Sequence, residues 1–410
     1  MSAESAEIEK PPVGRLFIPS LIMSAFAASV SGGILGILTR DIAIEFNVPV
    51  AVAGQLATIN SLAEFAVAFL IGFLAIRFKH KTLLLGGVLI VAFSAIGGFF
   101  SPNLFFMLFF FALEGIGSVI VSVMGTTLIG DSLPLKQKAK AISYMATAVA
   151  ATTIAGALTI GLVADFGGWR SIFLVYTLPA SVLALVAAHR GLPSIAPEES
   201  CYTGARCYKT AFKHVFSSKS AAFCLIAGFL LSTTGLRVYT GTFFQEVFGM
   251  PRSIYSIVFS TIAATAMVAY IVGGRLVNSV GRKNLTVATI LAGSITEMLV
   301  FLMPEMWTAV AMDLAHVFVS WIGAIAITSY VLEQIPQSRS TMMSVRSVVN
   351  SLGEVVAPIL GGALLLLFAY NLLFSYQVAG FVFGSIGIVA SVIFFFLTKD
   401  STIIQKEAIT

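Results

Sequence analysis

The 410-residue sequence is 58% hydrophobic and only 10% charged, with a mean hydropathy of +0.97. A soluble domain carries about 25% charged residues, so this composition cannot cover a water-facing surface and excludes a soluble fold. The formal net charge of +5 would suit a nucleic acid or an acidic partner only if the basic residues formed one patch. The three cysteines, an odd number, cannot form a disulfide framework.

Twelve runs of predominantly apolar residues are each long enough to cross a bilayer, which takes about 20 residues. The sequence therefore predicts an all-α membrane protein with twelve transmembrane helices. The longest stretch outside the runs, 190–219, is too short for a soluble catalytic domain, so we expect the function to reside among the helices. The predicted spans are 16–38, 50–76, 82–101, 104–130, 141–164, 171–189, 220–247, 254–278, 284–303, 307–333, 341–368 and 371–397.

The lysines and arginines fall mainly in loops on one side of the predicted membrane, the side that also holds both termini. Five residues are exceptions: Arg40, Arg170 and Arg252 in loops on the opposite side, and Arg237 and Arg346 within spans. Because lysine and arginine are enriched in cytoplasmic loops, we expect a multi-pass protein of the cell membrane with both termini in the cytoplasm. The basic surplus is thus a topology signal, and no nucleic-acid partner is expected.

Features of the first six spans recur in the last six at an offset of about 200 residues, as expected of an internal repeat. Gly72 to Lys81 aligns with Gly274 to Lys283, and Gly156 to Gly161 aligns with Ala357 to Gly362. We therefore expect two six-helix halves with a substrate path at their interface near the midplane. Their predicted bounds are 1–189 for the N-terminal half, 190–219 for a cytoplasmic linker and 220–410 for the C-terminal half.

The aligned segments resemble the major facilitator superfamily of transporters, whose loop between helices 2 and 3 reads G-x-L-x-D-R-x-G-R-K. The first copy keeps Gly72, Leu74, Arg77 and Lys81, and the second keeps Gly274, Leu276, Gly281, Arg282 and Lys283, with Ile76 and Asn278 in place of the aspartate. The resemblance covers essentially the whole chain and is closest in appearance to the twelve-span drug/proton antiporter branch. It implies export of an amphipathic or cationic compound, with Gly72, Arg77, Gly274 and Arg282 in a cytoplasmic gate.

Two departures weaken the match to that branch. Proton-coupled exporters commonly have an arginine in helix 4 where this chain has Glu114. Antiporters of the superfamily carry G-P-x-x-G-G in helix 5, and here Ala157 replaces the proline and Ile160 the first glycine of the final pair. Exchange is therefore only weakly supported by that motif.

Glu114 is followed by Ser118 and Ser122 at helical spacing, so the fourth span carries a polar face. An ionisable group inside a span is costly and usually faces a cavity, a partner or a transport path. We interpret Glu114 as a proton or cation site, with a carboxyl group hydrogen-bonded between helices as the alternative. Glu64 is the midplane acid of the second span and a further candidate.

The tenth span carries Asp313, His316 and Ser320 on one helical face. A histidine titrates near neutrality and suits a proton relay, but a plain hydrogen bond between helices is equally consistent with His316. Asp313 lies close to the predicted end of its span and could belong to the headgroup region. Both residues stay candidates for proton coupling or substrate binding.

Arg237 lies deep in the seventh span, and a guanidinium there needs an anionic partner. Glu114, Asp313, Glu354 or an anionic substrate could supply it. Arg237 therefore keeps open an alternative function, the uptake of a small organic anion. Arg346 and Glu354 belong to a ladder in the eleventh span that is more typical of an internal brace, although Glu354 lies deep enough to reach a cavity.

Spans 1, 4, 7 and 10 are each polar on one side, and these are the helices that line the cavity in the resembled fold. The residues expected to line that cavity are Ser24, Ser31, Ser118, Ser122, Thr233, Tyr239, Phe244, Ser320 and Trp321.

The sequence lacks a GxxxxGK[ST] phosphate loop, an HExxH motif and a GxSxG elbow, so we expect no enzyme activity, cofactor or metal. It predicts a secondary transporter that moves a small solute by alternating access with coupled protons. The expected partners are the small-molecule substrate, protons and the lipid bilayer, and we expect a monomer. A non-transporting receptor or sensor is a further alternative, which the lack of a soluble output domain disfavours.

Overall fold

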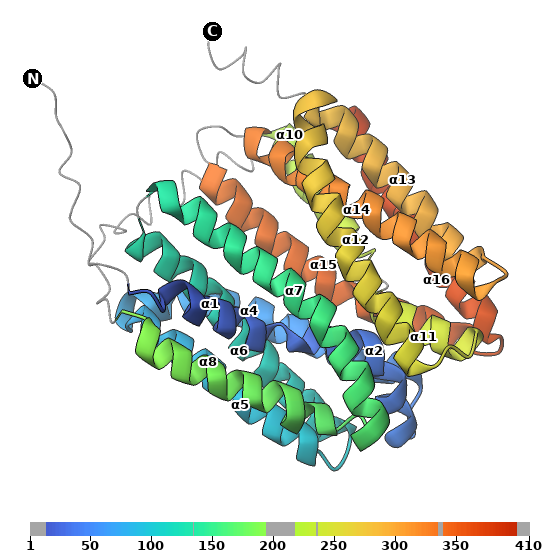
Figure 1. Ribbon diagram of the computed structural model, residues 1–410. Coiled ribbons are helices and arrows are strands. Elements are labelled where there is room, and N and C mark those ends of the chain that lie inside the picture. Colours follow the sequence, from blue (N-terminus) through green and yellow to red (C-terminus); the bar gives the residue numbers. More distant parts are fainter. Residues whose placement is uncertain (1–13, 134, 194–217, 235–236, 335–338, 400–410) are drawn as a thin grey trace, which may run out of the picture.

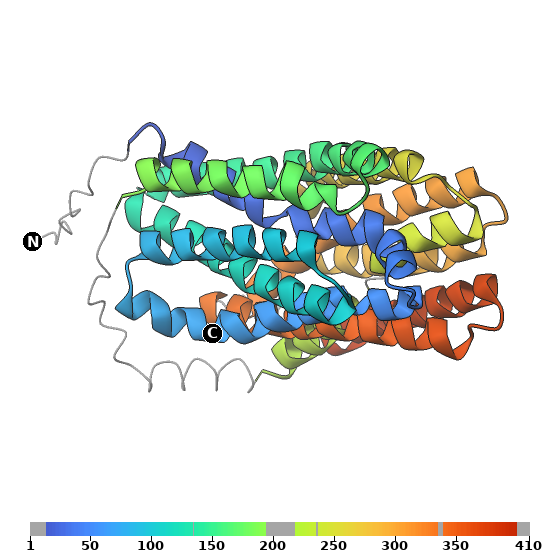
Figure 2. The same cartoon turned by 90° about the horizontal axis from the view of Figure 1, so that it is seen from below.

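The computed structural model describes residues 14–133, 135–193, 218–234, 237–334 and 339–399, and the regular elements in these ranges are helices that run along roughly one axis (Figures 1 and 2). The first half contains α1 (Phe17–Ala28), α2 (Val30–Glu45), α3 (Val50–Ala53), α4 (Gln55–Arg77), α5 (His80–Phe100), α6 (Leu104–Ser132), α7 (Leu135–Gly167), the π-helix η1 (Phe173–Thr177) and α8 (Leu178–Gly191). The second half contains α10 (Lys219–Ser232), α11 (Arg237–Val247), α12 (Arg252–Ser279), α13 (Arg282–Leu302), α14 (Met306–Gln334), α15 (Arg339–Leu367) and α16 (Leu372–Leu397).

The described residues contain 11 helical stretches that are long and apolar enough to cross a membrane. One of them, Phe17–Glu45, joins α1 and α2 into a single span. The predicted seventh span, 220–247, is divided: α10 is a shorter apolar helix that ends at Ser232, and α11 begins at Arg237. With α10 and α11 taken together as the remaining crossing, the twelve-helix prediction is confirmed.

We call the end of the bundle where α1 begins and α16 ends the proximal end, and the opposite end the distal end. Within the first half α6 packs against both α4 and α5, and within the second half α13 packs against both α14 and α16. The two halves meet through α7 against α12, α4 against α15 and α2 against α11. Figure 1 shows α7 and α12 side by side toward the distal end.

Glycines let the helices of the first half approach closely, as small residues do in membrane bundles. A Cβ at Gly117 of α6 would lie 2.7 Å from the carbonyl oxygen of Gly87 in α5, and a Cβ at Gly87 would lie 3.0 Å from the carbonyl oxygen of Gly117. Neither position can hold a larger side chain without moving the partner backbone. This contact sets the position of α6, the helix that carries Glu114.

Lys81 and Lys283 make equivalent contacts in the two halves. The Lys81 Nζ donates to the carbonyl oxygens of His189 (2.7 Å) and Leu192 (2.8 Å), at the end of α8. The Lys283 Nζ donates to the carbonyl oxygen of Thr398 (2.7 Å), at the end of α16. A cation suits the carboxyl end of a helix, where carbonyl groups lack partners and the helix dipole is negative. Each lysine therefore ties two helices of its own half together, which agrees with the predicted internal repeat.

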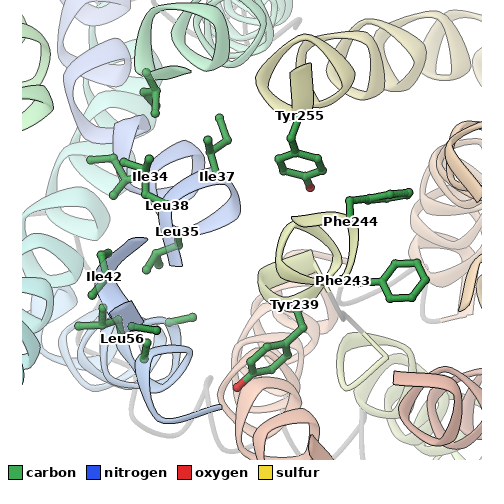
Figure 3. Close-up of a cluster of buried hydrophobic side chains, with 14 of the residues drawn as sticks. Ile34, Leu35, Ile37, Leu38, Ile42, Leu56, Tyr239, Phe243, Phe244 and Tyr255 are labelled. Carbon is green, nitrogen blue, oxygen red and sulfur yellow. The ribbon is translucent and has the colours of Figure 1, made fainter. Parts of the chain in front are cut away.

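The largest buried apolar cluster joins both halves toward the distal end. Figure 3 shows Ile34, Leu35 and Ile37 of α2 beside the aromatic rings of the second half. The labelled aromatic side chains there are Tyr239, Phe243 and Phe244 of α11 and Tyr255 of α12. Gln245 adds a polar contact across this boundary, since its Nε2 donates to the carbonyl oxygen of Ile37 (3.0 Å).

Ion pairs also join the halves at the distal end. Arg252 of α12 donates from Nη1 to Asp41 of α2 (3.0 Å) and from Nε to Asp165 of α7 (3.0 Å). One guanidinium thus bridges two carboxylates of the other half. We call Arg252, Asp41 and Asp165 the distal latch. The pair between Arg170 and Glu45 (2.7 Å) lies within the first half and makes no such bridge.

Candidate functional site

The polar faces of α4 and α6 bring two carboxyl groups of the first half together. Asn60 donates from Nδ2 to Glu114 Oε2 (2.5 Å) and to the carbonyl oxygen of Phe111 (3.0 Å). Glu114 is only 8% exposed. Gly115 permits this approach, because a Cβ there would collide with the backbone oxygen of Asn60.

One turn further along the same pair of helices, Ser118 donates from Oγ to Glu64 Oε1 (2.8 Å). Asn60 and Glu64 are four residues apart on α4, as are Glu114 and Ser118 on α6, so the two contacts form consecutive rungs. Each rung joins a carboxyl group of one helix to a neutral donor of the other. A neutral donor can serve either protonation state of the acid, which suits a group that binds and releases protons or cations.

Glu354 approaches this pair of helices from the second half. It is exposed on α15, the helix that packs against α4, and its carboxyl group is close enough to repel that of Glu64 electrostatically. Two acids from opposite halves therefore lie near each other at the boundary between the halves. Such a pair attracts a cation or shares a proton.

The predicted polar face of the tenth span turns toward α13. The His316 Nδ1 lies 2.9 Å from the carbonyl oxygen of Gly293 in α13, and a Cβ at Gly293 would lie 2.9 Å from Ser320 Oγ. Asp313, one turn from His316, is 6% exposed, so it lies in the protein interior. The hydrogen bond between helices, one of the two interpretations of His316 from the sequence, is present in the structure. This face packs within the second half.

The remaining cavity candidates have varied surroundings. Ser24 and Thr233 are buried and donate to carbonyl oxygens of their own helical turns, those of Ser20 (2.8 Å) and Leu230 (2.6 Å). Trp321 packs against Tyr270 of α12, with ring centroids 4.9 Å apart, and Ser122 is exposed. The side chains of Ser31 and Arg237 lie outside the part of the chain that the structure describes.

Tyr239 and Phe244, predicted to line the cavity, are 1% and 0% exposed in the distal cluster. The Tyr239 hydroxyl donates to the carbonyl oxygen of Pro358 (2.9 Å) and lies 3.3 Å from that of Ala51 in the first half. Gln55 of the first half donates to the same Pro358 oxygen (3.1 Å). These side chains join the halves at the distal end.

The predicted gate residues lie at the proximal end. Arg77 is the exposed last residue of α4, and Gly72 precedes it in that helix. Gly274 is exposed near the end of α12. Arg282 pairs with Glu333 of α14, a helix of the same half. This ion pair braces the second half and does not cross to the first.

Sequence reasoning did not find the distal latch. Arg252 was interpreted only as a charge in an outer loop, and Asp41 and Asp165 carried no assigned role. The sequence does contain a signal for it. Arg252 follows one distal turn, and Asp41 and Asp165 precede two others, so these side chains can pair if the three turns meet. The pairing itself depends on the fold.

A two-half bundle of membrane-spanning helices, with carboxyl groups gathered between its helices, defines a polytopic membrane transporter. A family model described as Major Facilitator Superfamily matches residues 20–336. The chain belongs to the Major Facilitator Superfamily. It is therefore a transporter and not an enzyme.

Two named relatives are similar to this chain over most of their length. "Multidrug resistance protein 2" of Bacillus subtilis (strain 168) is 23% identical over 319 residues, which cover 75% of this chain and 77% of that protein. "Multidrug resistance protein 1" of the same organism is 24% identical over 355 residues, covering 84% and 88%.

A solved bacterial homologue of the human lysosomal transporter Spinster, inward-facing and unoccupied, superposes with a TM-score of 0.78 at 17% identity. The match covers 95% of this chain and 97% of that one. The nucleoside transporter NupG superposes with a TM-score of 0.77 at 14% identity, covering 93% and 98%. At these identities the likeness concerns the fold, and the resemblance to the superfamily in fold is confirmed.

Proposed function

We propose that this transporter exports an amphipathic or cationic compound in exchange for protons. The observation that carries the proposal is the group of acids between α4, α6 and α15, where Glu64 and Glu114 accept hydrogen bonds from neutral donors and Glu354 interacts electrostatically with Glu64. The relatives named as multidrug resistance proteins support drug-like compounds as the class of substrate.

In this mechanism Glu114 and Glu64 alternate between a protonated and a substrate-bound state. A cation and a proton compete for a carboxylate, because each satisfies the same negative charge. Release of the proton would recruit the cation, and binding of the next proton would release it. Glu354 lies on the other half. Through it, the protonation and occupancy of Glu64 and Glu114 would change how strongly the two halves attract or repel each other. Asp313, His316 and Arg237 are secondary candidates for the same coupling.

The proposed orientation follows the charge of the loops. With both termini in the cytoplasm of a cell-membrane protein, the proximal end faces the cytoplasm and the distal end faces outward. The distal latch and the aromatic cluster would then form the outer closure, and the molecule would represent a state that receives its substrate from the inside. Gly72, Arg77, Gly274 and Arg282 would act at the inner closure, with 190–219 as the linker between the halves.

A flux screen in proteoliposomes tests this proposal. Cationic dyes and organic acids are offered with and without an imposed pH gradient. We expect gradient-dependent transport of a cation that falls at least tenfold in Glu114→Gln, because the amide cannot exchange a proton. Thr126→Ala, at an exposed residue of the same helix whose hydroxyl donates to the carbonyl oxygen of Val123 (2.9 Å), is the matched control and should transport normally. Cation transport that ignores the gradient would contradict the proposed coupling.

The organic-anion alternative has one observation in its favour. Arg346 of α15 donates from Nη1 to Thr328 Oγ1 (2.9 Å), and its Nε is buried without a hydrogen-bond partner. Among the described residues the structure gives this guanidinium no carboxylate partner. Uptake of a labelled monocarboxylate that is lost in Arg346→Gln or Arg237→Gln, and unaffected in Glu114→Gln, would favour anion transport.

A further inference from the structure

A small, partly enclosed space lies beside Glu114 inside the first half. Its apolar walls include Ile34 of α2, Phe111 of α6 and Phe173 of η1. Its volume is about 20 Å³, and on the same measure one water molecule needs about 10–15 Å³. The space therefore accommodates one water molecule and nothing much larger.

Three polar side chains from three elements also line this space: Ser94 of α5, Glu114 of α6 and Thr177 of η1. Ser94 and Thr177 are each 4% exposed. The Ser94 hydroxyl donates to the carbonyl oxygen of Val91 (2.8 Å), so its own oxygen remains able to accept. The Thr177 hydroxyl is buried without a hydrogen-bond partner. A buried water typically makes about three hydrogen bonds, which matches this set.

Thr177 is the last residue of the π-helix η1, and its hydroxyl does not make the bond to its own helix that is common for threonine. In an α-helix a serine or threonine hydroxyl can donate to the carbonyl oxygen four residues earlier, as Ser181 does to Thr177 (2.9 Å). The corresponding carbonyl for Thr177 is that of Phe173, which instead accepts from the backbone N–H of Leu178. π-bulges are frequent at functional sites, and this one carries Thr177, whose buried hydroxyl belongs to a residue that lines the space beside Glu114.

We propose that this space binds one water molecule that accepts from Thr177 and donates to Ser94 and to the Glu114 carboxyl group, making Thr177 a positioning residue for Glu114. The carboxyl group is then held from both sides, by Asn60 of α4 and by the water. The existence of this water site is independent of the proposed function. Its role in proton binding by Glu114 rests on that function.

Two measurements on the purified full-length transporter test the site. The first is a structure at a resolution that shows ordered water, in which we expect a density peak within hydrogen-bond distance of Thr177 Oγ1. The second is infrared difference spectroscopy between acid and alkaline pH, with the carboxyl band of Glu114 assigned by its loss in Glu114→Gln. In Thr177→Val, which keeps the shape but removes the hydroxyl, the band should shift to higher wavenumber because the carboxyl group loses a hydrogen bond.

Conservative variants separate positioning from structural damage. Thr177→Ser restores the hydroxyl and should restore the wild-type band. Ser181→Ala removes a hydroxyl bonded within its own helix and should leave the band unchanged. If Thr177→Val does not fold, Ser94→Ala takes its place, with the same shift expected. An unchanged band in Thr177→Val, or clear density without a water at Thr177, would overturn the proposal. If Glu114 shows no protonated carboxyl band at any pH, the proposed proton coupling is contradicted. The density at Thr177 then still tests the water site by itself.

Discussion

At the scale of single residues, the pairing of Glu114 with Asn60 decides what the site can do. A buried carboxyl group that bonds a neutral amide avoids an unsatisfied charge and is not locked into an ion pair by that contact. The second rung, Ser118 with Glu64, repeats the arrangement one turn away. Both acids can therefore change protonation state without breaking a salt bridge at these contacts.

Asn60→Leu tests the first rung through stability. Loss of a hydrogen-bond partner leaves Glu114 buried and less satisfied, which should lower the free energy of unfolding by about 1–3 kcal/mol. The melting temperature in detergent should fall accordingly. Ser61→Ala, the neighbouring position, is the control. The double variant Asn60→Leu with Glu114→Leu should recover part of the loss, because two apolar partners leave no polar group unsatisfied. Additive losses in the double variant would contradict the pairing.

Sequence patterns predicted the polar faces of the helices but not the neighbours of those faces. The spacing of Glu114 and Ser118 correctly puts both on one face, and the structure turns that face to α4. The spacing of Asp313, His316 and Ser320 is equally regular, yet His316 and Ser320 meet α13. Helical periodicity gives only the direction relative to the helix axis. Which helix lies in that direction depends on the rotation of each helix in the bundle, set by contacts far apart in the chain.

At the scale of elements, most predicted spans correspond closely to the observed helices, but the first continues to Glu45 instead of ending at 38 and the seventh is divided. Apolar length detects a membrane crossing but not a break within it. Thr233 and Thr234 follow α10 and donate to the carbonyl oxygens of Leu230 (2.6 Å) and Leu231 (2.7 Å). The backbone N–H groups of Thr233 and Thr234 donate to the same two oxygens (3.1 and 3.2 Å), so the end of α10 tightens into a turn of i→i+3 bonds. Threonine is too common in membrane helices for this signal to be read from the sequence.

Lys81→Met and Lys283→Met test the equivalent contacts that close each half. Each substitution removes a charge-assisted bond to carbonyl oxygens at a helix end, and each should lower the free energy of unfolding by about 1–3 kcal/mol. Thermal unfolding in detergent provides the measurement. Lys79→Met, at an exposed lysine beside Lys81, should change stability by less than about 0.5 kcal/mol. Equal effects at Lys79 and Lys81 would show that the contact carries no stability.

At the scale of the whole molecule, the two halves are joined distally by an apolar cluster and by the latch. An ion pair at a boundary of this kind contributes modestly to stability but discriminates between open and closed arrangements, because it exists in only one of them. Arg252 is suited to this role, since it bonds two carboxylates of the other half at once.

Arg252→Gln should shift the equilibrium toward distal opening. A loss of about 1–2 kcal/mol from the closed state changes the ratio of states by about five- to thirtyfold. The change is measured with spin labels at Pro102 and Glu305, which are exposed residues of distal turns in the two halves. Double electron–electron resonance should then show a longer distance between the labels. Glu45→Gln breaks an ion pair within the first half and should leave the distance distribution unchanged. A wild-type distribution in Arg252→Gln would rule out the latch as a determinant of closure.

We propose that a cation is exchanged for protons through the acids of α4 and α6. The most direct test is to let a gradient of the cation drive the movement of protons. Proteoliposomes are given an outward gradient of the transported cation and no initial pH difference, and the internal pH is followed with an enclosed dye. We expect the interior to become more acidic as the cation leaves, and we expect this change to disappear in Glu114→Gln. Substrate movement with no pH change in the wild-type protein would contradict it.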